Sequence, residues 1–375
     1  MATEQLAPRP AAVADVDRMP VHGIDHLELY VGNAAQAAFF FIRAFGFVET
    51  AYSGLETGRR DRVSHVLEQG RIRLVVTGTL SGEDDIGEHH KRHGDGVHKI
   101  ALSVPDAEAA YWHAVEHGAR GVLTPHRVED EHGSVSLSSV STYGDTVHLF
   151  VQRDGYRGPF LPGFEARGEP AGDGPFAGID HVVGNVELGH MEEWVGYYER
   201  VFGMTELIHF SDEAISTEYS ALMSKVMTDG SGRLKFPINE PAEGKRKSQI
   251  EEYLEYYRGS GVQHVALSTR DIVAAVAKLR DSGVDFLSIP ATYYDEVPGR
   301  VGEIEQDMAD LRRLGILVDR DDEGYLLQIF TKPLGDRPTL FFEIIERHGS
   351  RGFGEGNFKA LFQALEREQE RRGNL

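Results

Sequence analysis

The first half of this chain is repeated in its second half, and this internal repeat limits the folds that the chain can adopt. The segment HGIDHLELYVGNAAQAAFFFIRAFGF, which starts at His22, aligns with AGIDHVVGNVELGHMEEWVGYYERVFGM, which starts at Ala177. Each segment has the pattern of a short strand, a polar turn and an amphipathic helix. A second matching pair starts at Gly94 and Gly259, where an apolar strand precedes a helix with an Asp near its start. The chain therefore contains two similar domains, each built from two β-α-β-rich units.

The pattern of each half predicts an α+β domain with a curved, barrel-like sheet. Short alternating runs such as RIRLVVTGTL and TLFFEIIER have the composition of strands and are bounded by Gly, Asp and Pro. Two such units would curve into one open barrel per domain, with a concave face that can hold a ligand. We expect a flexible tail over 1–20, a first domain over 21–153, a Gly- and Pro-rich linker over 154–177 and a second domain over 178–375.

The composition limits the partners and the metal chemistry of the chain. Its 375 residues include 60 acidic and 39 basic side chains, which give a formal charge of −21. This charge repels phosphate backbones and anionic lipids, so we expect neither a nucleic acid nor a membrane as partner. The chain has no cysteine, so a metal site must use His, Asp or Glu. No apolar stretch of about eighteen residues and no signal-peptide pattern occurs, which predicts a cytoplasmic protein.

A comparison of the two halves separates candidate metal ligands from structural residues. Both halves keep a histidine in the same Gly-Ile-Asp-His string, His26 in the first and His181 in the second. The strands GVHKIAL and GVQHVAL place Lys99 opposite His264. A protonated ammonium group has no lone pair for a metal ion, so only the second half keeps both histidines.

A carboxylate completes the set in the second half. Alignment of TVHLFVQR with TLFFEIIER places Phe150 opposite Glu343. Glu343 lies within an otherwise apolar strand, where a carboxylate that faces inwards is costly unless it is paired or bound to a metal ion. His181, His264 and Glu343 come from three strands of one predicted sheet, and such a set leaves about three coordination positions open, as suits a non-haem Fe(II) that activates O2.

Simpler interpretations exist for several of these residues. A lone strand histidine such as His26 is more often a hydrogen-bonded core residue than a ligand. Glu343 would be unremarkable if it faced solvent on an edge strand. The His-rich segment EHHKRHGDGVH, from Glu88 to His98, also contains Lys91 and Arg92, and we interpret it as a solvated helix end or loop rather than a metal site.

Seven short motifs stand out along the chain. They are GIDHVVGNV from Gly178, FPINEP from Phe236, KSQI from Lys247, GVQHVA from Gly261, QIFTKP from Gln328, FFEIIER from Phe341 and GFGEGNF from Gly352. Together they resemble the 4-hydroxyphenylpyruvate dioxygenase family. The resemblance runs from about residue 20 to the C-terminus and is densest after residue 178. It implies two tandem vicinal-oxygen-chelate domains, each a pair of βαβββ modules, of which only the second binds metal, and a C-terminal lid helix over 356–375.

The resemblance also implies roles for individual residues. His181, His264 and Glu343 would hold Fe(II). Gln263, Gln328 and Asn239 would take part in catalysis by orienting the substrate. The residues implied to contact the substrate are Ser224, Asn239, Gln249, Gln263, Gln328, Phe330, Phe341, Phe353, Asn357 and Phe358.

The family reaction implied for the chain is the conversion of 4-hydroxyphenylpyruvate and O2 to homogentisate and CO2, by oxidative decarboxylation, ring hydroxylation and side-chain migration. Two alternatives stay open. One is 4-hydroxymandelate synthase, which hydroxylates the benzylic carbon of the same substrate. The other is a metal-free binding protein on the same fold. The resemblance further implies a homo-oligomer, either a dimer or a tetramer.

Overall fold

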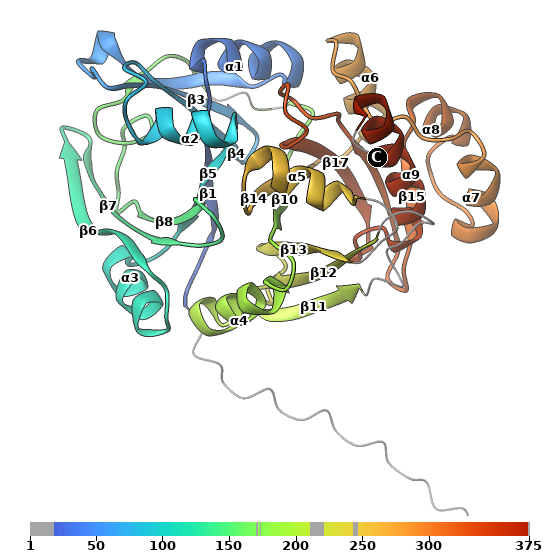
Figure 1. Cartoon of the computed structure of the whole chain (residues 1–375). Helices are drawn as coiled ribbons and strands as arrows, with labels where there is room; N and C mark the ends of the chain where they lie inside the picture. Colours follow the sequence, from blue (N-terminus) through green and yellow to red (C-terminus); the bar gives the residue numbers. More distant parts are fainter. Residues whose placement is uncertain (1–18, 170–171, 173, 211–220, 243–246, 374–375) are drawn as a thin grey trace, which may run out of the picture.

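The two halves of the chain form two curved sheets that lie side by side, with most helices on the outside (Figure 1). The computed structural model describes residues 19–169, 172, 174–210, 221–242 and 247–373. The expected tail over 1–20 lies almost entirely outside the described residues. No helix in the described ranges is both long enough and apolar enough to span a membrane.

The first sheet has nine strands in the order β6-β7-β8-β5-β1-β4-β3-β2-β9. Strand β1 pairs in parallel with β4 and antiparallel with β5, so it joins the two modules of the domain. The strands are β1 (Gly23–Tyr30), β2 (Val48–Ser53), β3 (Arg62–Gln69), β4 (Ile72–Thr79), β5 (Gly96–Ser103), β6 (Gly121–Asp130), β7 (Gly133–Ser141), β8 (Val147–Gln152) and β9 (Glu165–Ala166).

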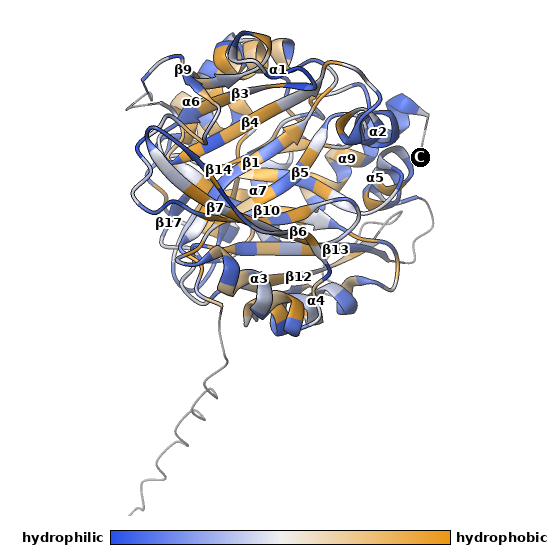
Figure 2. Cartoon of the chain, turned by 90° about the vertical axis from the view of Figure 1, so that its left-hand side faces the viewer, coloured by the Kyte–Doolittle hydropathy of each residue, from blue (hydrophilic) through white to orange (hydrophobic). Residues whose placement is uncertain are grey.

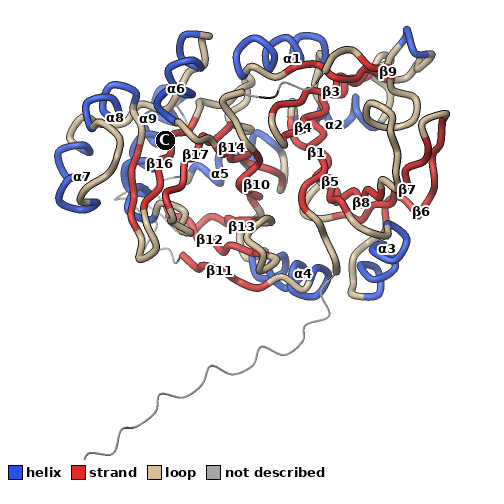
Figure 3. The backbone as a smooth tube through the Cα atoms, turned by 180° about the vertical axis from the view of Figure 1, so that it is seen from behind, coloured by secondary structure: helices blue, strands red, loops and turns tan. Residues whose placement is uncertain are grey.

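The second sheet has eight strands in the order β11-β12-β13-β10-β14-β17-β16-β15. Read from β15 to β11, this order matches the first sheet from β6 to β2 strand for strand, and only β9 has no counterpart. Seen from behind, the two sheets curve as separate half-barrels (Figure 3). The internal repeat is thereby confirmed. The strands are β10 (Gly178–Asn185), β11 (Thr205–Phe210), β12 (Ala221–Thr228), β13 (Lys235–Ala242), β14 (Gly261–Ser268), β15 (Leu317–Arg320), β16 (Tyr325–Phe330) and β17 (Phe341–His348).

The helices follow the same repeat and carry additions in the second half. One helix crosses over within each module, and α2 and α5 connect the two modules of their domains. The crossover helices are α1 (Ala34–Phe40, continued by a π-helical segment over Phe41–Phe45), α3 (Ala107–Glu116), α4 (Met191–Phe202) and α6 (Ile272–Asp281). The others are α2 (Asp85–His93), α5 (Gln249–Tyr257), α7 (Tyr293–Val301), α8 (Met308–Leu314) and α9 (Phe358–Arg372), with 3-10 turns at Leu55–Thr57 and Glu355–Asn357.

Local sequence accounts for the starts of equivalent helices. Asp106 caps α3 by accepting hydrogen bonds from the backbone N–H groups of Glu108 and Ala109. Asp271 caps α6 in the same way through the N–H of Ala274. A side-chain oxygen at this position satisfies amides that have no partner within the helix. The Asp that recurs in the two sequence segments therefore marks the same helix start in each domain.

Apolar residues from both domains form one continuous core. Figure 2 shows that the central strands are rich in apolar residues, while the outer helices carry both polar and apolar residues. Phe342 of β17 lies 5.7 Å from Phe41 and 5.4 Å from Phe45, measured between ring centroids. On another part of the interface, His148 Nε2 and the Tyr198 hydroxyl are 2.9 Å apart. The two domains therefore share their packing and are not joined by the linker alone.

The stretch 154–177, expected as a linker, also completes the first domain. Glu165 and Ala166 form β9, which pairs with β2 at the edge of the first sheet. The buried ring of Phe160 lies edge-on to His26, with 5.1 Å between ring centroids. Residues 160–166 therefore pack against the first sheet and extend its edge.

The strand register corrects one alignment made from sequence. Ala266 of β14 pairs with Glu343, and the equivalent Ala101 of β5 pairs with Leu149. Leu149, and not Phe150, therefore occupies the position of Glu343 in the first domain. Neighbouring strand residues face opposite sides of a sheet, so a shift of one residue would turn the compared side chain away from the cavity. The conclusion that the first half lacks the carboxylate is unchanged, because leucine is apolar.

The interpretation of Glu88 to His98 as a solvated segment is also wrong in part. Residues 85–93 form helix α2, and β5 begins at Gly96. His89 and His93 are buried at 5% and 1% exposure, on the helix face turned towards the second domain. Alternation of buried and exposed positions on this helix explains the mixture of histidines and cations, since Lys91 lies on the exposed side.

Candidate metal centre and substrate pocket

Two histidines and a glutamate meet on three adjacent central strands. His181 of β10, Ala266 of β14 and Glu343 of β17 form one row across the sheet. His264 lies two residues before Ala266 on β14, and residues two apart on a strand share a face. The Glu343 Oε2 atom is 3.1 Å from His181 Nε2 and 3.3 Å from His264 Nε2. All three side chains are buried, so Glu343 is not the exposed edge residue of the simpler interpretation.

Hydrogen bonds fix which nitrogen of each histidine faces the centre. His181 Nδ1 lies 2.8 Å from Asp180 Oδ1, and His264 Nδ1 lies 2.9 Å from Gln263 Oε1. Carboxylate and amide oxygens accept hydrogen bonds here, so each Nδ1 donates its proton. The neutral form of each ring then presents the lone pair of Nε2 to the centre, as a metal ligand requires.

The electrostatics of the triad keep Glu343 ionised despite its burial. Burial by itself raises the pKa of this carboxyl, but the charges of His181 and His264 and their hydrogen bonds outweigh it and bring the pKa to about 2. Burial lowers the pKa of His264 below its ordinary value. For His181, burial is outweighed by the charge of Glu343 and by hydrogen bonds to Asp180 and Glu343, which raise its pKa. Glu343 is therefore ionised, and a divalent metal ion that binds here would take the place of the proton shared with His181.

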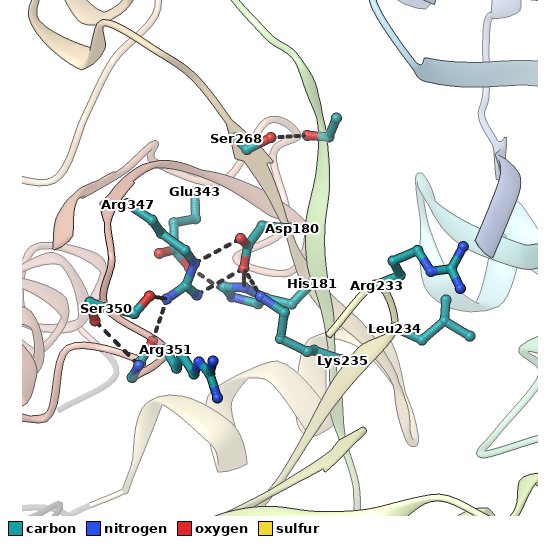
Figure 4. Close-up of polar contacts among 12 residues, drawn as sticks. Asp180, His181, Arg233, Leu234, Lys235, Ser268, Glu343, Arg347, Ser350 and Arg351 are labelled. Atoms are coloured by element: carbon teal, nitrogen blue, oxygen red, sulfur yellow. Dashed lines mark hydrogen bonds and ion pairs between the residues drawn. The ribbon is translucent and has the colours of Figure 1, made fainter. Parts of the chain in front are cut away.

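Asp180 holds His181 and is itself held by two cations (Figure 4). Its Oδ2 accepts from Arg347 Nε at 2.8 Å and its Oδ1 accepts from Arg347 Nη2 at 2.9 Å. Lys235 Nζ lies 3.0 Å from Oδ1. Burial raises the pKa of Asp180, but its hydrogen bonds to His181 and Arg347 and the charges of these two residues hold it well below its usual range. The aspartate is therefore a fixed anion that orients the imidazole.

The first domain keeps a copy of this support. Asp25 accepts from Arg153 Nε at 2.8 Å and from Arg153 Nη2 at 2.9 Å, and Arg73 Nη1 lies 3.5 Å away. His26 Nδ1 is 2.6 Å from Asp25 Oδ1. His26 is therefore a hydrogen-bonded buried residue, and the first domain has lost the ligands while it keeps the groups that would orient one of them.

The donor set of the second domain fits a divalent transition metal. One ligand atom each from His181, His264 and Glu343 lie within 4.8 Å of one another. Two imidazoles and one carboxylate on a single face leave other coordination positions free for substrate, which suits non-haem Fe(II). In the first domain Lys99 and Leu149 replace two of these donors, and the described residues form no comparable triad around His26.

The triad opens onto a largely apolar cavity of about 80 Å³. Eleven residues singled out from the sequence line it, three as candidate ligands and eight as candidate substrate contacts. Residues of this kind can hold an aromatic ring and give its polar groups hydrogen bonds. The eleven are His181, Ser224, Asn239, Gln249, Gln263, His264, Phe330, Phe341, Glu343, Phe353 and Phe358.

Aromatic rings pack around the metal ligands and under helix α9. Phe341 stacks on His264, with 4.8 Å between centroids and 19° between planes. Phe353 lies edge-on to His181 at 5.0 Å, and Phe358 lies edge-on to Phe210 at 4.9 Å. These contacts limit the directions in which the imidazoles can turn, and they line the cavity with ring faces and edges.

Two predicted substrate contacts lie outside the cavity wall. Gln328 is buried beneath the backbone of Gly354, where a Cβ atom would lie 2.3 Å from its Nε2. Asn357 Oδ1 instead accepts hydrogen bonds from the Tyr293 hydroxyl at 2.6 Å and from Arg300 Nη2 at 3.2 Å. Asn357 therefore ties the start of α9 to α7, and the structure places neither residue among those that line the cavity.

Sequence reasoning missed two groups of residues at this site. The first group is charged and lies behind His181, and it comprises Asp180, Lys235 and Arg347. The sequence did hold a signal for Asp180, because an Asp precedes the histidine in both Gly-Ile-Asp-His strings. The second group is apolar and has no local signature. It comprises Val183, Phe210, Leu222, Val226 and Pro237. The other apolar lining residues, Leu361, Phe362 and Leu365, belong to the expected lid helix, where their helical spacing was the signal.

Known proteins share both the sequence and the architecture of this chain. The family model of the Glyoxalase/Bleomycin resistance protein/Dioxygenase superfamily matches residues 23–140 and 178–329. The 4-hydroxyphenylpyruvate dioxygenase of Dictyostelium discoideum is 48% identical over 370 residues, which cover 95% of this chain and all of the relative. The protein of the same name from Xenopus tropicalis is 46% identical, over 93% of this chain and 92% of the relative.

A solved structure supports the same assignment. A mutant of 4-hydroxymandelate synthase from Streptomyces coelicolor superposes with a TM-score of 0.85 and 35% identity, over 94% of this chain and all of that one. The resemblance inferred from the motifs is thereby confirmed along nearly the whole chain. The chain belongs to the 4-hydroxyphenylpyruvate dioxygenase family of the Glyoxalase/Bleomycin resistance protein/Dioxygenase superfamily.

Proposed function

We propose that this enzyme converts 4-hydroxyphenylpyruvate and O2 to homogentisate and CO2. The observation that carries the proposal is the buried triad of His181, His264 and Glu343 at the wall of a cavity lined by aromatic and amide side chains. The high identity to dioxygenases of that name supports the same substrate. The overall reaction is balanced, because both oxygen atoms of O2 are incorporated and the substrate carboxylate leaves as CO2.

We propose Fe(II) as the metal, held by His181, His264 and Glu343. A bound Fe(II) would supply the redox chemistry that O2 needs to react with a closed-shell keto acid. The protein supplies the rest of the site. Asp180 and Gln263 accept the Nδ1 protons of the two histidines, which keeps both Nε2 atoms turned to the centre.

The cavity residues are proposed to position the aromatic end of the substrate. Phe341 and Phe358 offer ring faces and edges for the aromatic ring. Ser224 and Asn239 pair across β12 and β13, and they offer a hydroxyl and an amide to the phenol. A phenol buried in an apolar cavity loses free energy unless such partners replace water.

Helix α9 is proposed to exclude water during the reaction. Its residues Phe358, Leu361, Phe362 and Leu365 lie on the cavity wall at helical spacing. The C-terminal helix thereby narrows the cavity of the second domain to about 80 Å³. The corresponding cavity of the first domain, which no such helix covers among the described residues, measures about 580 Å³. Exclusion of water protects a reactive oxidant from side reactions and strengthens electrostatic contacts with the substrate.

Benzylic hydroxylation is the second candidate, because the chain superposes well on a 4-hydroxymandelate synthase. The higher identity to proteins named 4-hydroxyphenylpyruvate dioxygenase, 48% and 46% against 35% for the 4-hydroxymandelate synthase, favours ring hydroxylation instead. The cytoplasmic location and the dimeric or tetrameric state remain predictions.

Product analysis tests the proposal. The full chain is loaded with Fe(II) under anaerobic conditions, mixed with 4-hydroxyphenylpyruvate and air, and its products are separated by chromatography. We expect homogentisate from the wild type, none from Glu343→Ala, and homogentisate from Leu149→Ala, which truncates the matching position of the first domain. 4-Hydroxymandelate as the product would favour the second candidate, and the absence of turnover with stoichiometric iron bound would contradict both.

A further inference from the structure

A second group of metal-ligating side chains lies between the domains. One ring nitrogen each from His89 and His93 and a carboxylate oxygen of Asp145 lie within 4.8 Å of one another. The histidines are one turn apart on α2, so they share a helix face. Asp145 comes from the loop between β7 and β8. Helix α2 runs beside α5 of the second domain in both views of the ribbon (Figures 1 and 2).

The contacts of His93 place a lone pair against a carboxylate. Its Nδ1 lies 2.5 Å from the carbonyl oxygen of Tyr257, and its Nε2 lies 2.8 Å from Asp145 Oδ2. A carbonyl oxygen can only accept, so Nδ1 carries the proton of the neutral ring. The unprotonated Nε2 and the carboxylate would repel each other unless a positive centre, either a proton or a metal ion, lies between them. His181 and Glu343 show the same arrangement in the catalytic centre.

His89 supplies a further nitrogen that the protein does not use. Both of its ring nitrogens are buried and have no hydrogen-bond partner. A buried polar atom without a partner costs roughly 1–3 kcal/mol, so such a residue calls for an explanation. Burial lowers the pKa of His89 to about 3, which leaves the imidazole neutral and able to act as a ligand at neutral pH.

We propose that His89, His93 and Asp145 form a second metal site, separate from the catalytic centre, that takes Zn²⁺. Two imidazoles and a carboxylate are suitable ligands for this ion, and the half-exposed side chain of Asp145 leaves a fourth position to water. Ligands about 2.0 Å from a tetrahedral ion lie roughly 3.3 Å apart. His93 and Asp145 would therefore separate slightly, and the exposed carboxylate can rotate to do so.

The position of the site indicates what the ion does. His93 stacks on Tyr257, with 4.2 Å between centroids, and Tyr257 is the last residue of α5. The first residue of α5 is Gln249, which lines the substrate cavity. Arg337 of the second domain also donates from Nη1 to the carbonyl of Arg92 at 2.6 Å. A metal ion here therefore fixes α2 against α5 and stabilises the domain interface without touching the substrate.

An ion pair without metal is the competing account. A protonated His93 can pair with Asp145, and Arg92 Nη1 lies 3.5 Å from the same carboxylate oxygen. Such a pair satisfies the carboxylate but leaves both nitrogens of His89 without partners. The two accounts therefore differ in the metal content of the protein and in the role of His89.

Zinc stoichiometry tests the proposal without reference to activity. The full chain is stripped of metal with EDTA, dialysed against Zn²⁺ and analysed for bound metal, as wild type and as Asp145→Asn, His89→Gln and His90→Gln. We expect about one zinc fewer per chain in Asp145→Asn and His89→Gln than in wild type. His90→Gln is the matched control on the exposed side of the same helix, and we expect it to bind as wild type does.

A thermal measurement separates this site from the catalytic centre. In a His181→Ala/His264→Ala background, added Zn²⁺ is expected to raise the midpoint of thermal unfolding, and the further change Asp145→Asn is expected to abolish the rise. Asp145 is half exposed, so its isosteric replacement should not prevent folding. Equal zinc contents in wild type and Asp145→Asn, or a rise in midpoint that survives Asp145→Asn, would overturn the proposal.

Discussion

At the residue scale, the catalytic centre depends on groups that do not face the substrate. Asp180 orients His181, and Arg347 and Lys235 in turn hold Asp180 as an anion. A carboxylate behind a ligating histidine fixes the ring and makes it a better donor. The first domain retains the same Asp–Arg pair beside His26, where the described residues form no metal-ligand triad, so the pair also stabilises the fold by itself.

The two aspartates provide a matched experiment. Asp180→Asn is expected to weaken Fe(II) binding by about 10- to 100-fold, because the neutral amide is a poorer partner for His181 Nδ1. Asp25→Asn makes the same change in the first domain and should leave Fe(II) affinity unaltered. Equilibrium titration of both apo proteins with Fe(II) under anaerobic conditions measures the effect. Equal affinities for the two variants would contradict a role for Asp180 in metal binding.

A buried ion pair in the first domain predicts a pH dependence of stability. Lys99 Nζ lies 2.5 Å from Glu28 Oε2, and burial raises the pKa of Glu28 while Lys99 and Thr77 lower it, to about 2 overall from an ordinary value of 4.5. Because the pKa of Glu28 is lower in the folded protein than in the unfolded chain, the unfolded chain takes up the proton at a higher pH than the folded protein does. The stabilisation is therefore complete above about pH 4.5 and is lost as the pH falls to about 2, by roughly 3 kcal/mol.

Urea denaturation at several pH values measures this contribution. Glu28→Gln is expected to be less stable than wild type at pH 7, because it leaves the charge of Lys99 buried without its partner. The difference should shrink as the pH falls towards 2. The double variant Glu28→Gln/Lys99→Met removes both charges and should recover part of the lost stability. A difference that stays constant with pH would exclude the ion pair as its source.

At the scale of elements, helix α9 decides how closed the substrate cavity is. The 3-10 turn before it is fixed to α7 through Asn357, and its apolar face covers the cavity. The hinge-like Gly354 has a positive φ of 79°, a conformation that other residues adopt only with strain. The helix is therefore anchored at its start and packed along one face.

Truncation of one cavity residue on α9 tests this role. Phe358→Ala is expected to raise KM for 4-hydroxyphenylpyruvate by about 2- to 10-fold, which corresponds to the loss of an aromatic contact of about 0.5–1.5 kcal/mol. Phe39→Ala removes an equally large ring from α1, where it is 63% exposed, and should leave KM unchanged. Steady-state kinetics gives the comparison, and an unchanged KM in Phe358→Ala would argue that α9 only packs against the sheet.

At the scale of the whole molecule, the first domain supports the strand that carries Glu343. The ring of Phe342, the preceding residue, points to the opposite face of β17 and packs against Phe41 and Phe45. Loss of either ring leaves a cavity in the shared core. The first domain therefore contributes to stability even though it lacks residues equivalent to His264 and Glu343.

Calorimetry tests whether the two domains unfold together. We expect one cooperative transition for the wild type, because its core is continuous. Phe45→Ala is expected to cost about 3–5 kcal/mol and to move this single transition to lower temperature. Phe39→Ala again serves as the exposed control. Two separate transitions, of which only one responds to Phe45→Ala, would show that the domains are energetically independent.

The sequence by itself determined the repeat, the family and the three candidate ligands. Strand and helix patterns depend on residues close together in the chain, so they can be read without knowledge of the fold. The contrast between His264 and Lys99 needed only an alignment of one strand with its repeat. The ligands also belong to motifs whose order along the chain matches the family, which is why His181 and Glu343 could be named in advance.

Only the tertiary structure decided the register and the burial of side chains. Leu149, and not Phe150, is the equivalent of Glu343 in the first domain. This equivalence depends on hydrogen bonds between strands that are far apart in sequence. His93 packs against Tyr257 of the second domain, and no local pattern encodes that contact. Gln328 is covered by the backbone of Gly354 and is not among the residues that line the cavity. Each outcome results from contacts between distant segments, whose energies a local pattern does not contain.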